Sequence, residues 1–215
     1  MEQGGVLKGG NRPMAREAVA DSFKLCLPEW LKDFAAEAAR VSYPDASERM
    51  RLAIELARRN VAAGTGGPFG AAVFEAEKGR LLAVGVNLVV AARCSILHAE
   101  VVALMLAQQR LGSFDLGGEG LPACELVTSA EPCAMCFGAL LWSGVRRLVC
   151  AAREEDVRAV GFDEGPKPDD WPGELQRRGI TVVRDLCRDE AVPVLKAYVV
   201  EGGLVYNPRQ PLPPD

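Results

Sequence analysis

Residues 124–152 read CELVTSAEPCAMCFGALLWSGVRRLVCAA, and this stretch decides the fold. The run from Cys124 to Ser129 predicts a short strand. The stretch from Pro132 to Ser143 predicts a helix, and Gly144 is a typical residue to end it. A second strand is predicted from Arg147 to Ala152. Strands that alternate with a helix in this way indicate an α/β arrangement with parallel strands.

The same alternation continues on both sides of this stretch. On the C-terminal side we predict helices over residues 154–160, 174–178 and 189–200, with a strand over 180–183. On the N-terminal side we predict helices over 28–40, 45–64 and 95–111, and a β-hairpin from two apolar runs at 69–74 and 81–90. The predicted fold is an α/β sandwich around a largely parallel sheet, which the hairpin makes mixed.

Length and composition favour one intracellular domain. The 215 residues are enough for a single core, and the net charge of −4 argues against a general nucleic-acid binder. Neither a secretory signal nor an apolar run of about 20 residues is visible, so we expect a cytoplasmic protein without a membrane span. We divide the chain into a mobile tail (1–27), a catalytic domain (28–201) and a C-terminal segment (202–215).

The chemistry is concentrated around the single histidine. His98 and Glu100 are separated by one residue, and Pro132-Cys133-Ala-Met-Cys136 follows in the predicted strand–helix unit. This is the H-x-E … P-C-x-x-C signature of zinc nucleobase deaminases. One histidine and two thiolates are three zinc ligands, which leaves a fourth position for the water that a catalytic zinc requires.

Helical geometry supports this interpretation. Cys133 and Cys136 are three residues apart and so share a face of the predicted helix. Pro132 is the first residue of that helix, and Glu131 or Ser129 caps it. His98 and Glu100 point to one place only if the site lies off the end of their helix, so we predict that position. Glu100 is then the proton carrier and not a ligand.

The alternative is a closed structural zinc site, which would need Cys94, Cys124 or Cys150 as its fourth ligand. A carboxylate beside the metal has no purpose in such a site, and Glu100 therefore favours catalysis.

At these residues the chain resembles the cytidine deaminase superfamily, in its cytidine/deoxycytidylate-type zinc branch, from about Met50 to Val200. Within it, the chain is most similar to bacterial guanine deaminases. The similar stretches are Gly66-Gly-Pro-Phe-Gly-Ala-Ala-Val73, Asn87 before Val89-Val90, Thr128-Ser-Ala-Glu-Pro-Cys133 and Gly161-Phe-Asp-Glu-Gly165.

This resemblance implies a three-layer α/β/α sandwich with a five-stranded mixed sheet, a zinc ion and a homodimer. It implies that Asn87 and the backbone N–H of Ala99 hydrogen-bond a purine, and that Phe69 and Phe162 pack on its faces. It also implies that Glu164 binds the guanine edge and acts as a second proton carrier. The adjacent Asp163 is an alternative for that role.

Several interpretations stay open at this point. Asn87 is also a common turn former, and Phe69 and Phe162 are also ordinary core residues. Residues 202–215 are either a lid over this or a neighbouring active site, or a frayed tail. Guanine is the expected substrate. The alternatives are a cytosine nucleoside, an aminotriazine such as ammeline, or adenosine in transfer RNA, which the scarcity of bases after Ala191 disfavours. A non-catalytic zinc protein is the remaining alternative.

Overall fold

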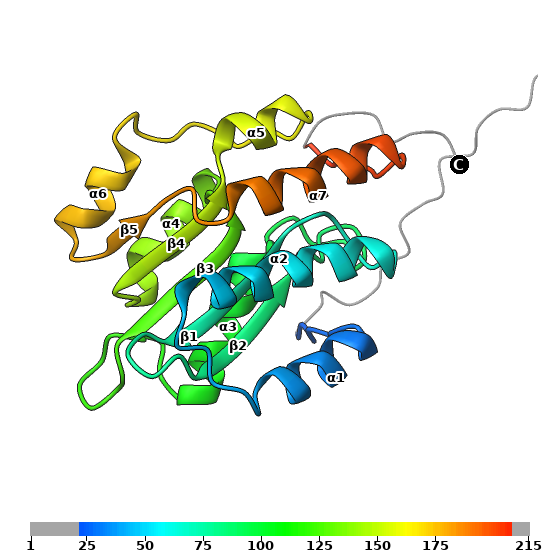
Figure 1. The fold of residues 1–215 in the computed structure, drawn as a ribbon. Helices are drawn as coiled ribbons and strands as arrows, with labels where there is room; N and C mark the ends of the chain where they lie inside the picture. The colour runs from blue at the N-terminus through cyan, green and yellow to red at the C-terminus, as the bar shows by residue number, and fades with distance from the viewer. Residues whose placement is uncertain (1–21, 208–215) are drawn as a thin grey trace, which may run out of the picture.

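A computed structural model of the protein describes residues 22–207, in which five strands form one mixed sheet between two layers of helices (Figure 1). The strand order is β2-β1-β3-β4-β5. The strands are β1 (Gly70–Glu75), β2 (Leu81–Val86), β3 (Cys124–Ala130), β4 (Arg147–Ala152) and β5 (Thr181–Val183). β1 pairs antiparallel with both β2 and β3, whereas β3, β4 and β5 run parallel. The predicted three-layer fold is confirmed.

Seven helices cover the two faces of the sheet in this part of the chain. Helices α1 (Glu29–Ala38), α2 (Ala46–Ala62), α5 (Glu154–Ala159) and α7 (Arg188–Val200) contribute to the core on one face. Helices α3 (Ala99–Leu111), α4 (Ala134–Ser143) and α6 (Trp171–Arg177) lie on the other face (Figure 1). The strands are buried on both sides: in β1, Ala72 and Phe74 face the first core, and Ala71 and Val73 face the second. No helix within residues 22–207 is both long and apolar enough to cross a bilayer.

Four predicted boundaries were wrong, and the corrections concern the site. β2 ends at Val86 instead of residue 90, and α3 begins at Ala99 instead of residue 95. The residues between β2 and α3 form turns that are closed by backbone hydrogen bonds, for example from Cys94 N to the carbonyl of Val89 (3.0 Å). α4 begins at Ala134, two residues later than predicted, and α6 covers 171–177 instead of 174–178.

The two ends of the chain were predicted to be a tail and a C-terminal segment. Of the predicted tail, residues 1–21 lie outside the described residues, and residues 22–27 form no helix or strand. Of the C-terminal segment, residues 202–207 are described and 208–215 are not.

Candidate active site and metal centre

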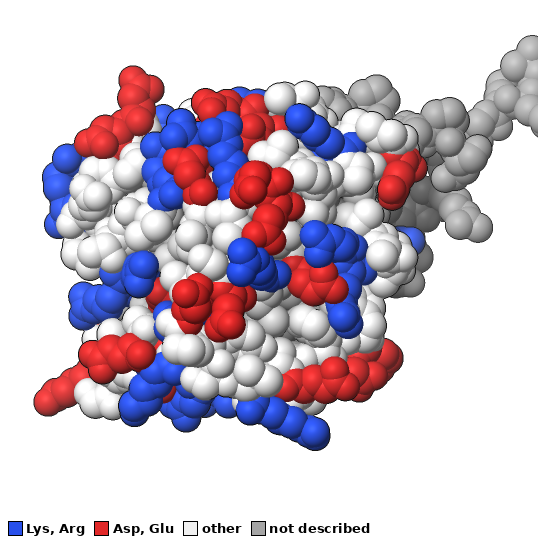
Figure 2. Space-filling view, in the orientation of Figure 1, with Lys and Arg blue, Asp and Glu red and all other residues white. Residues whose placement is uncertain are grey.

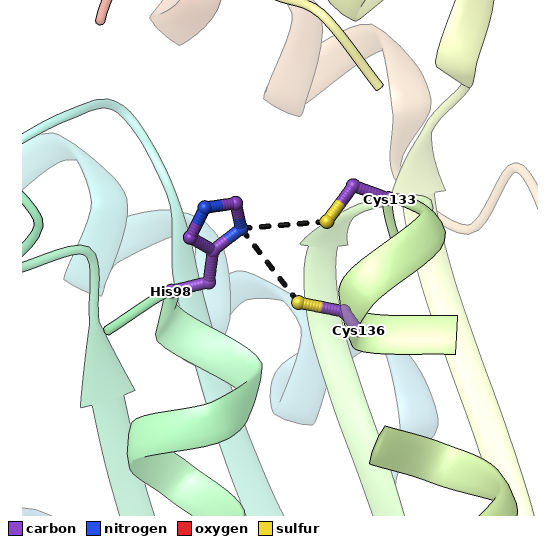
Figure 3. Close-up of side chains that lie close together, drawn as sticks. All are labelled: His98, Cys133 and Cys136. Atoms are coloured by element: carbon purple, nitrogen blue, oxygen red, sulfur yellow. Dashed lines mark hydrogen bonds between the residues drawn. The ribbon is translucent and has the colours of Figure 1, made fainter. Parts of the chain in front are cut away.

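The three predicted metal ligands meet where the first residues of two helices face each other (Figure 3). His98 is the N-cap of α3, so its extended backbone directs the ring off the end of the helix. Cys133 is the N-cap of α4, and Cys136 lies in the first turn of the same helix. His98 Nδ1 is 3.4 Å from Cys133 Sγ and 3.7 Å from Cys136 Sγ. The predicted placement of the site off the helix end is confirmed.

These distances fit a tetrahedral zinc ion. Zinc bonds of about 2.3 Å to sulfur and about 2.0 Å to nitrogen separate neighbouring donor atoms by roughly 3.5 Å. Within residues 22–207 the group of candidate metal-binding side chains whose ligand atoms lie within 4.8 Å of one another has three members: His98, Cys133 and Cys136. Cys94, Cys124 and Cys150 do not join this group, so a closed site with one of them as fourth ligand is not formed. Three donors leave the fourth position for water.

The start of α4 differs from the prediction in how it is capped. Cys133, and not Glu131 or Ser129, is the N-cap, and Pro132 precedes the helix. Glu131 instead accepts a hydrogen bond from Glu154 N (3.0 Å), and Ser129 Oγ accepts one from Gly70 N (3.1 Å). The extended backbone of Cys133 at the N-cap places its sulfur beyond the helix end, 3.4 Å from His98 Nδ1.

The two thiols share a proton when no metal is present. The hydrogen bond from Cys136, together with His98, lowers the pKa of Cys133 to about 4, although burial acts in the opposite direction. The pKa of Cys136 is raised well above its usual range by that same hydrogen bond and by burial. Because metals bind thiolates, zinc binding releases this remaining proton.

Glu100 lies beside the metal-binding group without belonging to it. Glu100 lies in the first turn of α3 and is 6% exposed. Its carboxylate is close enough to Cys136 for a hydrogen bond. Burial, and then the negative charge of Cys133, raise the pKa of Glu100 to about 6. A carboxylate with a pKa near neutrality is well suited to accept a proton and return it.

Two further predicted residues carry buried polar atoms without partners. Asn87 is 1% exposed and Glu164 is 6% exposed, and neither Asn87 Nδ2 nor Glu164 Oε2 has a hydrogen-bond partner among the described residues. Such atoms are costly unless a ligand pairs with them. The third unpaired atom, Glu125 Oε2, has Arg147 Nη1 at 3.6 Å and lies away from this site. The oxygen of Asn87 accepts from Val89 N (3.3 Å), so this residue caps a turn and also presents a free donor.

Asp163 and Glu164 have opposite environments. Asp163 is exposed, accepts a hydrogen bond from Gly165 N (2.9 Å) and lies 3.7 Å from Arg158. Glu164 is buried, and burial raises its pKa to about 8, with the charge of Cys133 as the next cause. Its carbonyl accepts from Ala134 N (2.8 Å), which attaches this loop to the first turn of α4.

Aromatic side chains form one wall of the site. The rings of Phe69 and Phe162 meet edge to face with centroids 5.1 Å apart, and Tyr206 meets Phe162 at 5.3 Å. No base fits between the two phenylalanines, so they do not pack on its opposite faces as predicted, and Phe162 also belongs to the hydrophobic core. Burial raises the pKa of Tyr206 well above its usual range, and the nearby charges of Glu100, Cys133 and Glu164 also contribute. Tyr206 therefore belongs to the site, and sequence reasoning noted it only as the aromatic residue of the C-terminal segment.

Asn60 is a residue of the site region that sequence reasoning missed. It is fully buried in α2 and donates to the carbonyls of Gly67 and Asn87, both at 2.9 Å. The sequence could have indicated Asn60, because a polar residue on the apolar face of a helix needs a hydrogen-bond partner. Ala99 is the first residue of α3, where a backbone N–H has no acceptor within the helix, as its predicted role requires.

Comparison with known proteins gives the same classification from several directions. The family described as "Cytidine and deoxycytidylate deaminase zinc-binding region" matches residues 44–152. The chain is 38% identical over 115 residues to the guanine deaminase of Bacillus subtilis, covering 54% of this chain and 69% of that protein. It is 33% identical to a tRNA-specific adenosine deaminase of Haemophilus influenzae over 125 residues, 58% of this chain and 68% of that one.

Solved structures agree with this classification. The structure of a guanine deaminase from Nitrosomonas europaea is 52% identical, with a TM-score of 0.79, and the match covers 86% of this chain and 100% of that chain. A structure of a complex with 2,6-diaminopurine is 53% identical, with a TM-score of 0.80, over 88% of this chain and 99% of that chain.

Replacement of one metal ligand tests the assembly of the centre. We expect Cys133→Ala to purify with far less than one zinc per chain and with reduced thermal stability, because a thiolate ligand is lost. Cys150→Ala is the matched control, since Cys150 is also buried but lies outside the ligand group. Mass spectrometric metal analysis measures both variants. Full zinc occupancy in Cys133→Ala would remove Cys133 from the ligand set.

Proposed function

The chain belongs to the cytidine and deoxycytidylate deaminase family, and from that premise we propose that it hydrolyses guanine to xanthine and ammonia. As a member of this family it is a zinc-dependent hydrolytic deaminase. The observation that carries the choice of guanine is the pair of unpaired buried atoms, Asn87 Nδ2 and Glu164 Oε2. The relatives that act on guanine, in Bacillus subtilis and Nitrosomonas europaea, support the same choice.

Guanine complements these two atoms. Its O6 and N7 accept hydrogen bonds, which suits the amide donor of Asn87 and the free N–H of Ala99. Its N1–H and amino group donate, which suits the carboxylate of Glu164. The edge-to-face pair of Phe69 and Phe162 provides an aromatic wall against which the flat base packs. A bound guanine would thus satisfy both atoms that burial leaves unpaired.

The proton transfers are assigned to Glu100. His98, Cys133 and Cys136 would hold the zinc ion, whose Lewis acidity would lower the pKa of the attacking water. The carboxylate of Glu100 accepts a proton as the water oxygen bonds to the ring carbon that bears the amino group, and it donates that proton to a ring nitrogen. It then carries the second water proton to the amino group, which leaves as ammonia. Burial raises the pKa of Glu164 to about 8, so the carboxylate that accepts from guanine is also basic enough to take up a proton and to serve as a second carrier.

The C-terminal segment is proposed to be a lid over this chain's own site. Tyr206 lies against Phe162 and so close to Gly67 that a Cβ there would be 2.8 Å from the tyrosine oxygen. Asn207 donates to Gly161 O (2.8 Å) and accepts from Asp163 N (2.8 Å), on either side of Phe162. These contacts hold the segment to the loop that carries Glu164, and Gly202 with a φ of +81° allows the turn that leads into it.

A small-molecule substrate is supported over transfer RNA by the distribution of charge. Lys and Arg alternate with Asp and Glu over the face formed by α1, α2 and α7, without a region of one sign (Figure 2). Residues 191–215 contain two basic residues, Lys196 and Arg209. A protein that holds a phosphate backbone needs a concentrated positive surface. We further propose a cytoplasmic location, because none of the seven cysteines forms a disulfide, as is typical of a reducing compartment. A role in purine catabolism follows from the proposed reaction.

Removal of the proton carrier tests the mechanism. We expect Glu100→Gln to bind zinc normally and to lose about 10²–10⁴-fold in kcat, since the amide cannot accept the proton of water. Metal analysis and single-turnover ammonia release measure these two properties on one preparation. Near-normal turnover in Glu100→Gln would disprove the assigned role.

The substrate assignment is tested with zinc-loaded protein and four substrates: guanine, cytidine, adenosine and ammeline. We expect the highest kcat/KM on guanine and a loss of about 10–100-fold on guanine in Glu164→Gln, as for a lost hydrogen bond to a charged group. Asp163→Asn is the control in the neighbouring residue and should behave as the unaltered protein. A fall in Asp163→Asn alone would assign the role to Asp163, and a preference for another substrate would refute guanine.

The protein is also proposed to be a homodimer through the outer surface of α4. Trp142 and Phe114 are 80% and 86% exposed, and Leu116 N donates to Ser143 O (2.9 Å), which places the loop of Phe114 against the end of α4. α4 contains no charged residue. A helix that is apolar on all sides is normally buried, and a helix without charge meets its own copy across a two-fold axis without repulsion.

Light scattering after gel filtration tests this dimer. We expect a dimer for the unaltered protein and a monomer for Trp142→Glu, because the substitution would place two carboxylates near the two-fold axis. Val200→Glu, a change at an equally exposed apolar residue on α7, is the control and should remain dimeric. A monomeric unaltered protein at tens of micromolar would exclude the dimer.

A further inference from the structure

Lys167 is a buried base beside the site that the reaction described above does not use. Its side chain is 2% exposed, and Nζ donates to the carbonyl of Pro132 (2.6 Å) and pairs with Glu154 Oε2 (2.9 Å). The ammonium also lies 5.3 Å from the centre of the Trp171 ring. Removing an ammonium from water costs several kcal/mol, so a lysine is buried in this way only where its partners are well placed.

The contacts of Lys167 connect two segments that carry chemistry. Pro132 directly precedes the metal ligand Cys133, and Lys167 follows Glu164 by three residues in the sequence. A second contact links the same segments, because Ala134 N donates to the carbonyl of Glu164 (2.8 Å). Gly165 has a φ of +66°, and a Cβ there would lie 3.0 Å from that of Ala134, so the loop passes very close to α4.

We propose that Lys167 is a positioning residue that sets where the Glu164 carboxylate lies relative to the metal-binding thiolates. Its ammonium holds the carbonyl of Pro132, and with it the start of α4, at a set distance from the loop of residues 164–167. The proposal rests on the proposed role of Glu164 in binding guanine. The two prolines that flank Lys167 in Gly165-Pro-Lys-Pro168 restrict its backbone, so motion of the ammonium and motion of the loop are coupled.

The ion pair with Glu154 does not by itself explain why Lys167 is buried. Glu154 is already paired with Arg158, whose Nη2 lies 2.7 Å from Glu154 Oε1 on the solvent side. The Pro132 carbonyl, in contrast, accepts a side-chain hydrogen bond from Lys167 alone within residues 22–207. The charge also acts on the site, because the ammonium opposes the rise in the pKa of Glu164 that burial causes.

The experiment compares Lys167→Met with Lys78→Met, the same change at a lysine whose side chain is 76% exposed. The readouts are zinc content, kcat and KM for guanine, and the visible spectrum of the cobalt(II)-substituted protein, which reports the geometry at the two thiolates. We expect Lys167→Met to bind metal, to lose about 10–100-fold in kcat/KM, as is typical for residues that orient ligands, and to shift the cobalt bands. Lys167→Arg should recover part of the activity, because it keeps a buried donor. Lys78→Met should match the unaltered protein in every readout.

Two outcomes would overturn the proposal. A Lys167→Met protein with lower thermal stability but unchanged kinetics and cobalt spectrum would make Lys167 a structural residue only. If Lys167→Met does not fold, Lys167→Gln is measured by the same criteria, and an unchanged spectrum with unchanged kinetics again decides against positioning. The cobalt spectrum needs no substrate. Failure of the unaltered protein to release ammonia from guanine would therefore refute the proposed function without deciding the role of Lys167.

Discussion

Everything in the site depends on two helix N-termini that face each other on one side of the sheet. α3 presents His98 as its N-cap, α4 presents Cys133 as its N-cap, and both side chains point off their helices into the space between them. Each first turn has free N–H groups and the positive end of a helix dipole, which favour negative charge. That setting suits Glu100 and the thiolates, all of which are anionic when the site is active. The parallel pairing of β3 and β4 keeps α4 at this edge, because α4 connects the two strands.

The site contains several buried acidic side chains, and a metal cation balances their negative charge. Burial, and then the charge of Cys133, raise the pKa of both Glu100 and Glu164, and all three residues are buried. The hydrogen bond between the two thiols lowers the pKa of Cys133 and raises that of Cys136, so this pair retains a proton more readily than two separate thiolates would. A divalent cation offsets this charge and releases that proton. Burial, more than this charge, raises the pKa of Glu100 to about 6, where one carboxylate is able both to accept and to return a proton.

The fold and the metal centre could be predicted from the sequence because both depend on local patterns. The ligand spacing of Cys133 and Cys136 implies a shared helix end, and strands that alternate with helices imply the layers. The helix boundaries were less predictable, since the N-caps here are His98 and Cys133, which make no side-chain capping hydrogen bond. Residues such as Asn60 and Lys167 act on backbone carbonyls of distant segments, so no spacing in the sequence reveals their partners.

The substrate side of the site shows why such distant contacts matter. Asn87, Phe69 and Glu164 all lie on loops, and a loop is only as well placed as the contacts that hold it. Asn60 holds the carbonyls of Gly67 and Asn87 from the interior of α2, while Asn207 holds the Glu164 loop from the end of the chain. The metal ligands depend less on such contacts, because the first residues of α3 and α4 place them, and the contact from Lys167 fixes the start of α4 relative to the Glu164 loop. The helices therefore position the metal ligands and Glu100. A few side-chain contacts to loop backbones position the residues that select the substrate ring.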